Sequence, residues 1–113
     1  MLKKSLRIRK KEDFERVFRS GSPLFFREIA CKIAKNSTDS LRIGFSFSKK
    51  HFPLATQRNR LRRQLSAFIE ESYGELPKGY DIVFFSLKKG KNIEKEELQS
   101  FILNIKRSLK DKK

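Results

Sequence analysis

The chain has 113 residues, and its 28 lysines and arginines against 13 aspartates and glutamates give a formal net charge of +15. This length allows one domain with a modest core and is too short for two. A charge this high attracts polyanions, of which nucleic acid is the leading candidate. A membrane surface is the alternative, but the sequence shows no long basic amphipathic helix, no lipidation signal and no run of ~20 apolar residues that could span a membrane.

The N-terminal segment and the cysteine content indicate where the protein works. The opening MLKKSLRIRKK is basic but lacks the apolar core of a signal peptide. The single cysteine, Cys31, excludes an internal disulfide and fits a reducing compartment. We therefore expect one soluble, cytoplasmic domain over residues 1–113, in which residues 1–10 form a basic, mobile arm.

The first predicted element is a short amphipathic helix over residues 11–20. Phe14, Val17 and Phe18 follow the i, i+3, i+4 spacing of one helical face, and Gly21 is suited to end the helix. Spacing alone favours packing in the core as the role of the two phenylalanines.

Two runs with the alternation of β-strands follow, LFFREIACKIAK and LRIGFSFSKK, separated by the turn signal NSTDS. The sequence predicts that they pair as a hairpin with one core face and one small, polar, open face. The residues expected on the core face are Phe25, Ile29, Cys31, Ile33, Leu41, Ile43, Phe45 and Phe47. Those expected on the opposite face are Phe26, Glu28, Ala30, Lys32, Arg42, Gly44, Ser46 and Ser48. Glycine and serine on this face leave room for a ligand.

The rest of the chain reads as helix, strand and helix. Pro53 is suited to open a helix that continues to about Tyr73. The apolar run YDIVFFSL, residues 80–87, is typical of a strand covered on both sides. A last helix is predicted to begin near Asn92, a good capping residue. The order α-β-β-α-β-α describes a single-domain α/β sandwich.

Four arginines lie within residues 58–63. On a helical wheel, Asn59, Arg60 and Arg63 face away from the apolar stripe, while Arg58 and Arg62 lie at its flank. A guanidinium group can bind two oxygens of one phosphate through two hydrogen bonds, and the amides at a helix N-terminus favour the same anions. A solvated charged face is the alternative interpretation. The scarcity of nearby acid, and an asparagine within a helix, favour nucleic-acid binding, without separating RNA from DNA.

The sequence offers few candidates for catalysis. Lys49 and Lys50 precede the arginine-rich helix and extend its cationic patch, and His51 is the only histidine. The carboxylates show no spacing typical of a two-metal or zinc site. Cys31 lies on the apolar side of its strand and is predicted to be a packed thiol. If the chain takes part in catalysis, another molecule supplies the chemistry.

Three blocks, in order, resemble one known family. They are LRIRKKEDFERVFRSG, then RIGFSFSKK followed after seven residues by RNRLRRQL, and finally YDIVFFSLKKG. Together they resemble the protein subunit of bacterial ribonuclease P over nearly the whole chain. The resemblance implies the fold of ribosomal protein S5 domain 2, with a left-handed strand–helix–strand crossover. It also implies an accessory subunit of an RNA-based endoribonuclease, a hydrolase in which a catalytic RNA removes the 5′ leader of precursor tRNA with magnesium held largely by that RNA.

The resemblance assigns partners and roles to individual residues. The partners would be the catalytic RNA and precursor tRNA, with no membrane, no DNA and no catalytic side chain in the protein. The residues implied to contact the catalytic RNA are Arg58, Asn59, Arg60, Arg62 and Arg63, with Lys49 and Lys50. The leader would lie in a cleft between the first helix and the sheet, lined by Phe14, Phe18, Lys32, Arg42 and Ser46.

The leader cleft reverses the spacing-based preference for packing Phe14 and Phe18 in the core. Aromatic stacking contributes ~1–3 kcal/mol per base and tolerates any sequence, which suits a protein that accepts many leaders. Some family members carry an aromatic residue where this chain has Lys32, so a phosphate contact is expected there instead of stacking.

Two other classes of protein compete with this interpretation. A structural RNA-binding protein, such as a small ribosomal component, would share the arginine-rich helix but gives no reason for a leader cleft. A metal-dependent protein nuclease is poorly supported by the scattered carboxylates.

Overall fold

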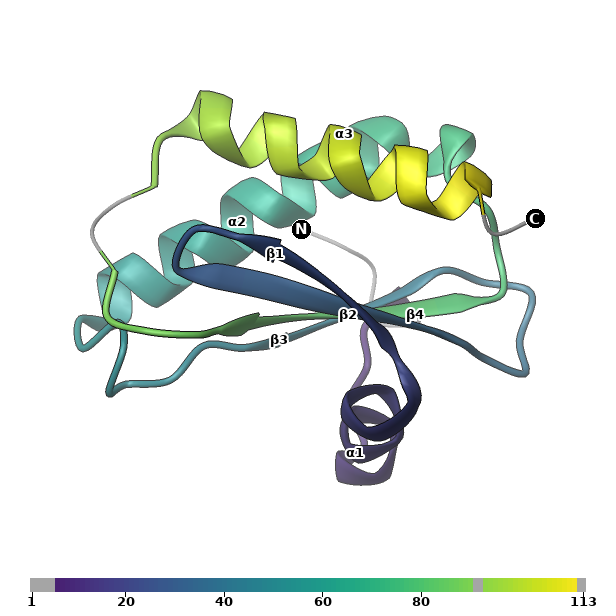
Figure 1. Cartoon of the computed structure of the whole chain (residues 1–113), viewed down its shortest axis with the longest axis horizontal. Helices are drawn as coiled ribbons and strands as arrows, with labels where there is room; N and C mark the ends of the chain where they lie inside the picture. Colours follow the sequence, from purple (N-terminus) through teal and green to yellow (C-terminus); the bar gives the residue numbers. More distant parts are fainter. Residues whose placement is uncertain (1–5, 91–92, 112–113) are drawn as a thin grey trace.

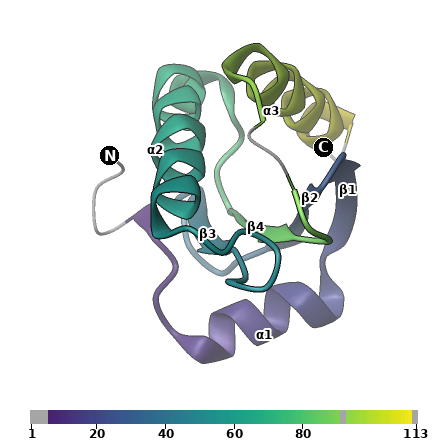
Figure 2. The ribbon, with the colours of Figure 1, turned by 90° about the vertical axis from the view of Figure 1, so that its left-hand side faces the viewer.

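A four-stranded sheet lies in the middle of the molecule, with helix α1 on one face and helices α2 and α3 on the other (Figures 1 and 2). The computed structural model describes residues 6–90 and 93–111. The elements are α1 (Lys11–Ser20), β1 (Ser22–Phe26), β2 (Ile29–Lys35), β3 (Arg42–Ser46), α2 (Ala55–Ser72), a 3₁₀ turn (Tyr73–Glu75), β4 (Tyr80–Ser86) and α3 (Lys95–Asp111). The predicted single-domain α/β sandwich is confirmed.

The strands lie in the order β1-β2-β4-β3. β1 and β2 form an antiparallel hairpin, β4 is antiparallel to β2, and β3 is parallel to β4. Parallel neighbours require a crossover connection, and α2 provides it between β3 and β4. The predicted hairpin between the two strand-like runs is therefore wrong, because β4 lies between β2 and β3.

The first strand-like run folds back on itself and forms both β1 and β2, so the predicted order α-β-β-α-β-α lacks one of the strands that precede α2. Phe26 is paired with Ile29, so Arg27 and Glu28 make a two-residue turn, and Arg27 has a φ of 56°. No Gly, Asn or Asp marks this turn in the sequence, although such turns favour these residues. Because of this turn, Phe25 and Phe26 each lie on the face opposite to the one predicted. Phe26 stacks on Phe101 of α3 with ring centroids 5.2 Å apart, whereas Phe25 is 66% exposed on the opposite face.

The main core lies between the sheet and helices α2 and α3. The other residues predicted for the core face are buried in it, apart from Phe45, which is partly buried against it. Phe84 lies at its centre and contacts Phe45 and Phe101 at centroid separations of 5.7 and 5.8 Å. On the opposite face, α1 covers Asp81 and Val83, both fully buried. β4 is thus covered on both sides, as predicted.

The start of the chain departs from the expectation of a mobile arm over residues 1–10. Residues 1–5 lie outside the described part. Ile8 is buried against Val17 and Val83, and its amide donates to the carbonyl of Ile43 at 2.9 Å. An apolar side chain therefore holds this segment beside β3.

The predicted helix ends also differ in detail. α2 begins at Ala55, after Leu54 as its N-cap, and not at Pro53. Gly21 does terminate α1, and its amide donates to the carbonyl of Val17 at 2.8 Å. Asn92, predicted to open the last helix, lies outside the described residues.

Candidate nucleic-acid interface

Helix α2 presents an arginine face to solvent because its apolar residues are held by the core. Leu61, Leu65, Ser66, Phe68 and Ile69 are buried. On the other side, Asn59, Arg60 and Arg63 are exposed, while Arg58 and Arg62 are half-buried. This arrangement confirms the helical wheel drawn from the sequence. Thr56, Asn59, Arg62 and Arg63 line a shallow hollow on this surface.

Two of these side chains have neutral partners within the protein. The Nη1 of Arg58 donates to the carbonyl oxygens of Phe52 and Pro53 at 2.7 and 3.2 Å, which fixes the loop before the helix. The Nη1 of Arg62 donates to Oδ1 of Asn59 at 2.8 Å. Among the ion pairs within residues 6–90 and 93–111, none includes an arginine of α2. The positive charge of this face is therefore available to an external anion.

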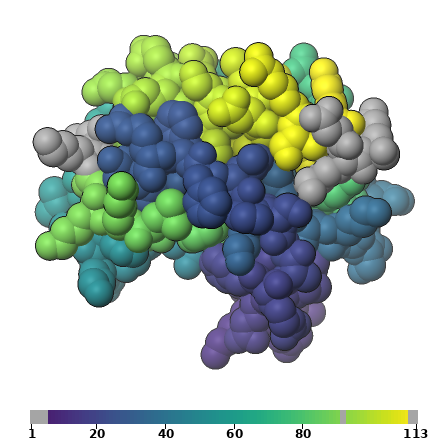
Figure 3. All heavy atoms as spheres, viewed as in Figure 1, coloured from purple at the N-terminus to yellow at the C-terminus, as the bar shows by residue number. Residues whose placement is uncertain are grey.

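A second pair of lysines extends the cationic surface. Because β3 and β4 are parallel, the loops that follow them start at the same edge of the sheet. The amide of Gly90 donates to the carbonyl of His51 at 3.3 Å, which joins these loops. Figure 3 shows the loop after β3 (teal) beside the segment after β4 (green). The exposed Lys49 and Lys50 thus lie at the same edge as the exposed pair Lys88 and Lys89, which we call the lysine edge.

His51 and two serines hold the loops of the lysine edge. The hydroxyl of Ser86 lies 2.9 Å from Nδ1 of His51 and accepts the amide of Ser48 at 2.9 Å. His51 therefore helps to join the loops that follow β3 and β4. Sequence reasoning missed Lys88 and Lys89, because only the parallel pairing of β3 with β4 brings them to the other lysines.

Phe14 and Phe18 lie between α1 and the sheet and are only half-buried. Phe14 packs over Gly44, where a Cβ atom would lie 2.8 Å from Cε1 of the ring, so only glycine allows this approach. Phe18 meets Phe85 edge to face, with ring centroids 5.3 Å apart. Each ring packs against the protein on one side and leaves part of its surface exposed to solvent.

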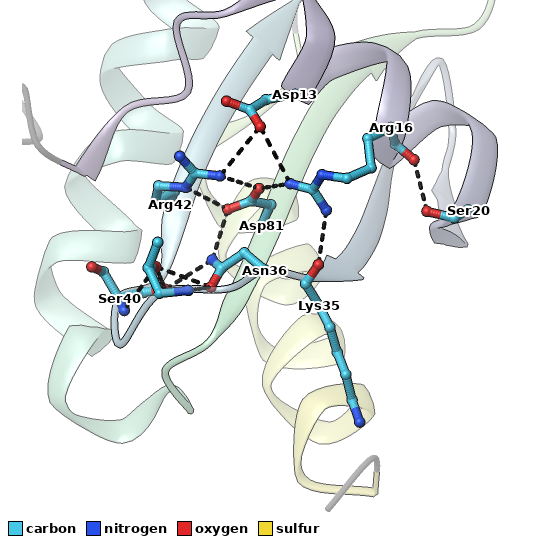
Figure 4. Close-up of polar contacts among 9 residues, drawn as sticks. Asp13, Arg16, Ser20, Lys35, Asn36, Ser40, Arg42 and Asp81 are labelled. Atoms are coloured by element: carbon cyan, nitrogen blue, oxygen red, sulfur yellow. Dashed lines mark hydrogen bonds and ion pairs between the residues drawn. The ribbon is translucent and has the colours of Figure 1, made fainter.

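A buried carboxylate fixes α1 to the sheet (Figure 4). Asp81 is fully buried, accepts two hydrogen bonds from Arg42 and one from Asn36, and forms an ion pair with Arg16 of α1. Burial alone would raise the pKa of Asp81, but the hydrogen bonds from Arg42 and Asn36 outweigh it and hold the pKa below its usual value. We call these four residues and Asp13, which lies 3.6 Å from Arg42, the Asp81 network.

The five residues predicted for the leader cleft fall into two groups. Phe14, Phe18 and the exposed Ser46 present surface to solvent. Arg42 is engaged by Asp81, and the ammonium group of Lys32 donates to the carbonyl of Phe18 near the end of α1. A cation at a helix C-terminus is favourable because carbonyls there lack partners. Arg42 and Lys32 therefore join α1 to the sheet beneath the two rings.

Known proteins are similar to this chain over nearly its whole length. The family model for ribonuclease P matches residues 2–110. The chain belongs to the ribonuclease P protein family. The ribonuclease P protein component of Finegoldia magna is 31% identical over 110 residues, covering 97% of this chain and 96% of the relative. That of Thermotoga petrophila is 36% identical over 83 residues, covering 74% and 70%.

Solved structures of ribonuclease P proteins share the fold. The Staphylococcus aureus RNase P protein superimposes with a TM-score of 0.80 at 24% identity, covering 94% of this chain and 99% of that one. The Thermotoga maritima RNase P protein gives a TM-score of 0.75 at 31% identity, covering 89% and 96%. The resemblance found in the sequence is confirmed, and membership of the ribonuclease P protein family implies a subunit role in a tRNA-processing ribonuclease.

Cys31, the only cysteine of this ribonuclease P protein, has a structural role. Cys31 is buried, and burial raises the pKa of its thiol to about 12, which confirms a packed thiol. Within residues 6–90 and 93–111, no three histidine, cysteine or carboxylate side chains gather as metal ligands do. None of the helices in the described ranges has the length and apolarity to cross a membrane.

Proposed function

We propose that this chain is the protein subunit of a cytoplasmic ribonuclease P ribonucleoprotein that binds RNA on two separate surfaces. α2 and the lysine edge would bind the catalytic RNA, and the face covered by α1 would hold the 5′ leader of precursor tRNA. The observation that carries the proposal is the arginine face of α2, whose Arg60 and Arg63 are exposed and form no ion pair with another described residue. α2 lies on the opposite side of the sheet from α1, which carries Phe14 and Phe18 (Figure 2).

The α2 surface supports binding to the phosphate backbone. Its exposed guanidinium groups and the ammonium groups of the lysine edge bind phosphate oxygens, which position a nucleic acid without reading its sequence. The hydrogen bond from Arg62 holds the amide of Asn59 in place. Arg58 is partly used by the preceding loop, so Arg60 and Arg63 are the stronger candidates for direct phosphate contacts.

The α1 face supports binding of a single strand. Phe14 packs over Gly44 and Phe18 against Phe85, and both rings leave surface on which unpaired bases stack whatever their identity. Ser46 adds a hydroxyl at the open end of β3. We assign Arg42 and Lys32 mainly to positioning α1, with their charge adding attraction for the leader phosphates.

Bond cleavage would belong to the RNA. The groups on both surfaces are cations, hydroxyls, an amide and aromatic rings, a set that binds phosphates and bases, and the cations in it would repel a divalent metal. We therefore propose that the magnesium ions are held largely by the catalytic RNA, as the family resemblance implies. The protein would neutralise phosphates and orient the leader, and magnesium would supply the activated water and charge stabilisation.

Reconstitution tests the proposal. The protein, the ribonuclease P RNA of the same genome and a precursor tRNA are combined at low magnesium. We expect no cleavage by the protein alone and faster cleavage by the RNA once the protein is added. Affinity for precursor tRNA should also exceed affinity for mature tRNA. Cleavage by the protein alone that one side-chain change abolishes would overturn the proposal, and affinity independent of the leader would favour a structural RNA-binding protein.

A further inference from the structure

One row of side chains crosses the α1 face of the sheet from edge to edge. Ser46 of β3 is the register partner of Phe85, Phe85 of Ala30, and Ala30 of Phe25. Register partners point to the same face of a sheet, so the four side chains form a continuous line. The row begins at a residue of the predicted leader cleft, passes the ring that Phe18 contacts, and ends at the β1 edge.

The row ends in an exposed aromatic ring. Phe25 is 66% exposed, and Leu87, which follows Ser86 and turns to the same face, is 37% exposed. The amide of Leu87 donates to the carbonyl of Glu28 at 2.8 Å, which holds the end of β4 against the β1–β2 turn. Figure 3 shows that turn (dark blue) next to the segment after β4 (green). Burial of a phenylalanine ring is favourable, so a partner that covers Phe25 would gain free energy of binding.

The surroundings of Phe25 favour a nucleic-acid occupant over an apolar protein partner. Lys88 and Lys89 directly follow Leu87 and are exposed, so phosphate groups are attracted to this end of the row. A second copy of the chain would bring another net charge of +15 to the same place. An exposed ring with cations at the same end of the strands is a combination that binds single strands through stacking and charge.

The position of the catalytic RNA gives the row a direction. α2 lies over the β3 side of the sheet, and α3 over the β1 side (Figure 2). If the catalytic RNA binds α2, the reacting phosphate lies nearer β3. A leader crossing the sheet along the row would then reach Ser46 and Phe85 first and Phe25 last.

We propose that Phe25 is a second stacking platform, which binds a leader nucleotide farther from the cleavage site than those at Phe14 and Phe18. This inference rests on the proposed function. It concerns a residue that the fold places on the leader side although the alternation of its run predicts a core position. Phe25 and Phe85 supply the aromatic surface of this row, which lies next to the row that contains Lys32.

A leader-length series tests the platform in the reconstituted holoenzyme. Precursor tRNAs with leaders of increasing length are bound under conditions that slow cleavage. For the wild type we expect affinity to rise in two steps as the leader lengthens. Phe25→Ala should remove only the second step, lowering affinity for long leaders about 5- to 10-fold, while Phe25→Tyr retains it. Leu103→Ala is the matched control, because Leu103 is 50% exposed on α3, away from the row.

Crosslinking gives a second, direct readout. Leaders with 5-iodouridine at successive positions should crosslink to the peptide containing Phe25 only at positions beyond those that reach Phe14. If wild type and Phe14→Ala behave as proposed but Phe25→Ala binds every leader like the wild type, the platform is refuted and the proposed function stands. If wild-type affinity ignores the leader altogether, the proposed function fails first. Loss of a dimer in Phe25→Ala without an effect on leaders would assign the ring to self-association and also refute the platform.

Discussion

Arg42 holds Asp81 through two parallel hydrogen bonds, from Nε to Oδ1 at 2.8 Å and from Nη2 to Oδ2 at 2.7 Å (Figure 4). The pair joins neighbouring strands, and Arg16 of α1 reaches the same carboxylate while donating to the carbonyl of Lys35 at 2.8 Å. The buried carboxylate of Asp81 thus holds α1 in its position on the sheet. Since Phe14 and Phe18 are carried by α1, the Asp81 network also sets the position of both rings.

We predict that Asp81→Asn destabilises the fold and weakens leader binding. An amide cannot accept from both guanidinium groups as a carboxylate does, and an uncompensated charge remains beside a buried site. The expected loss in free energy of unfolding is about 3 kcal/mol, measured by urea denaturation. Asp39→Asn is the control, because it makes the same chemical change at an exposed position. Equal stability of the two variants would contradict the role given to Asp81.

The stability of the wild type should fall as the pH drops below about 4. The pKa of Asp81 is lower in the folded protein than its usual value near 4. Between these two values the unfolded chain binds a proton that the folded chain does not, so acid favours unfolding. Asp81→Asn should therefore show a shallower loss of stability over this range, followed by denaturant midpoints at successive pH values. A residual slope is expected, because the pKa values of Glu75 and Glu97 are also lowered.

The Asp81 network shows where sequence reasoning stops. The outward face of α2 was predicted correctly because helical periodicity is local and the five residues concerned are nearly adjacent. Asp81 sits in an apolar run, and its partners Arg42 and Arg16 are 39 and 65 residues away, so no local pattern marks it as a junction. The place of β4 between β2 and β3 is equally non-local. Phe25 was assigned to the wrong face because the turn at Arg27 carries no turn signal.

Gly44→Ala should weaken leader binding without changing helix α2. The added Cβ would lie 2.8 Å from the Phe14 ring and 3.2 Å from Cβ of Ile8, so the ring must move. We expect a stability loss of about 1–3 kcal/mol from overpacking. Affinity for leader-bearing precursor tRNA should fall, as in Phe14→Ala, while affinity for mature tRNA stays unchanged. A wild-type preference for the leader in Gly44→Ala would show that the position of Phe14 does not matter.

Arg60→Ala should weaken binding to the catalytic RNA and make it less sensitive to salt. Removing one phosphate interaction lowers the slope of log affinity against log salt concentration by ~0.7–0.9. Arg107→Ala, an exposed arginine on α3, removes the same charge away from the proposed surface and should leave the slope almost unchanged. Filter binding over a range of salt concentrations measures both. Identical slopes for the two variants would mean that the net charge, and not the α2 face, drives binding.

Combining Arg60→Ala with Phe14→Ala tests whether the two surfaces act separately. The sheet and the core lie between α2 and α1 (Figure 2). The side chains of Arg60 and Phe14 therefore have no contact partners in common within the protein. Distant sites without shared partners add within ~0.5 kcal/mol. In the double variant we therefore expect the loss in affinity for the catalytic RNA to equal that of Arg60→Ala. The loss of leader preference should equal that of Phe14→Ala, measured by titrating the holoenzyme with precursor and mature tRNA. If either single variant reproduced both losses, catalytic RNA and leader would share one surface, and the division of labour between the two faces of the sheet would be refuted.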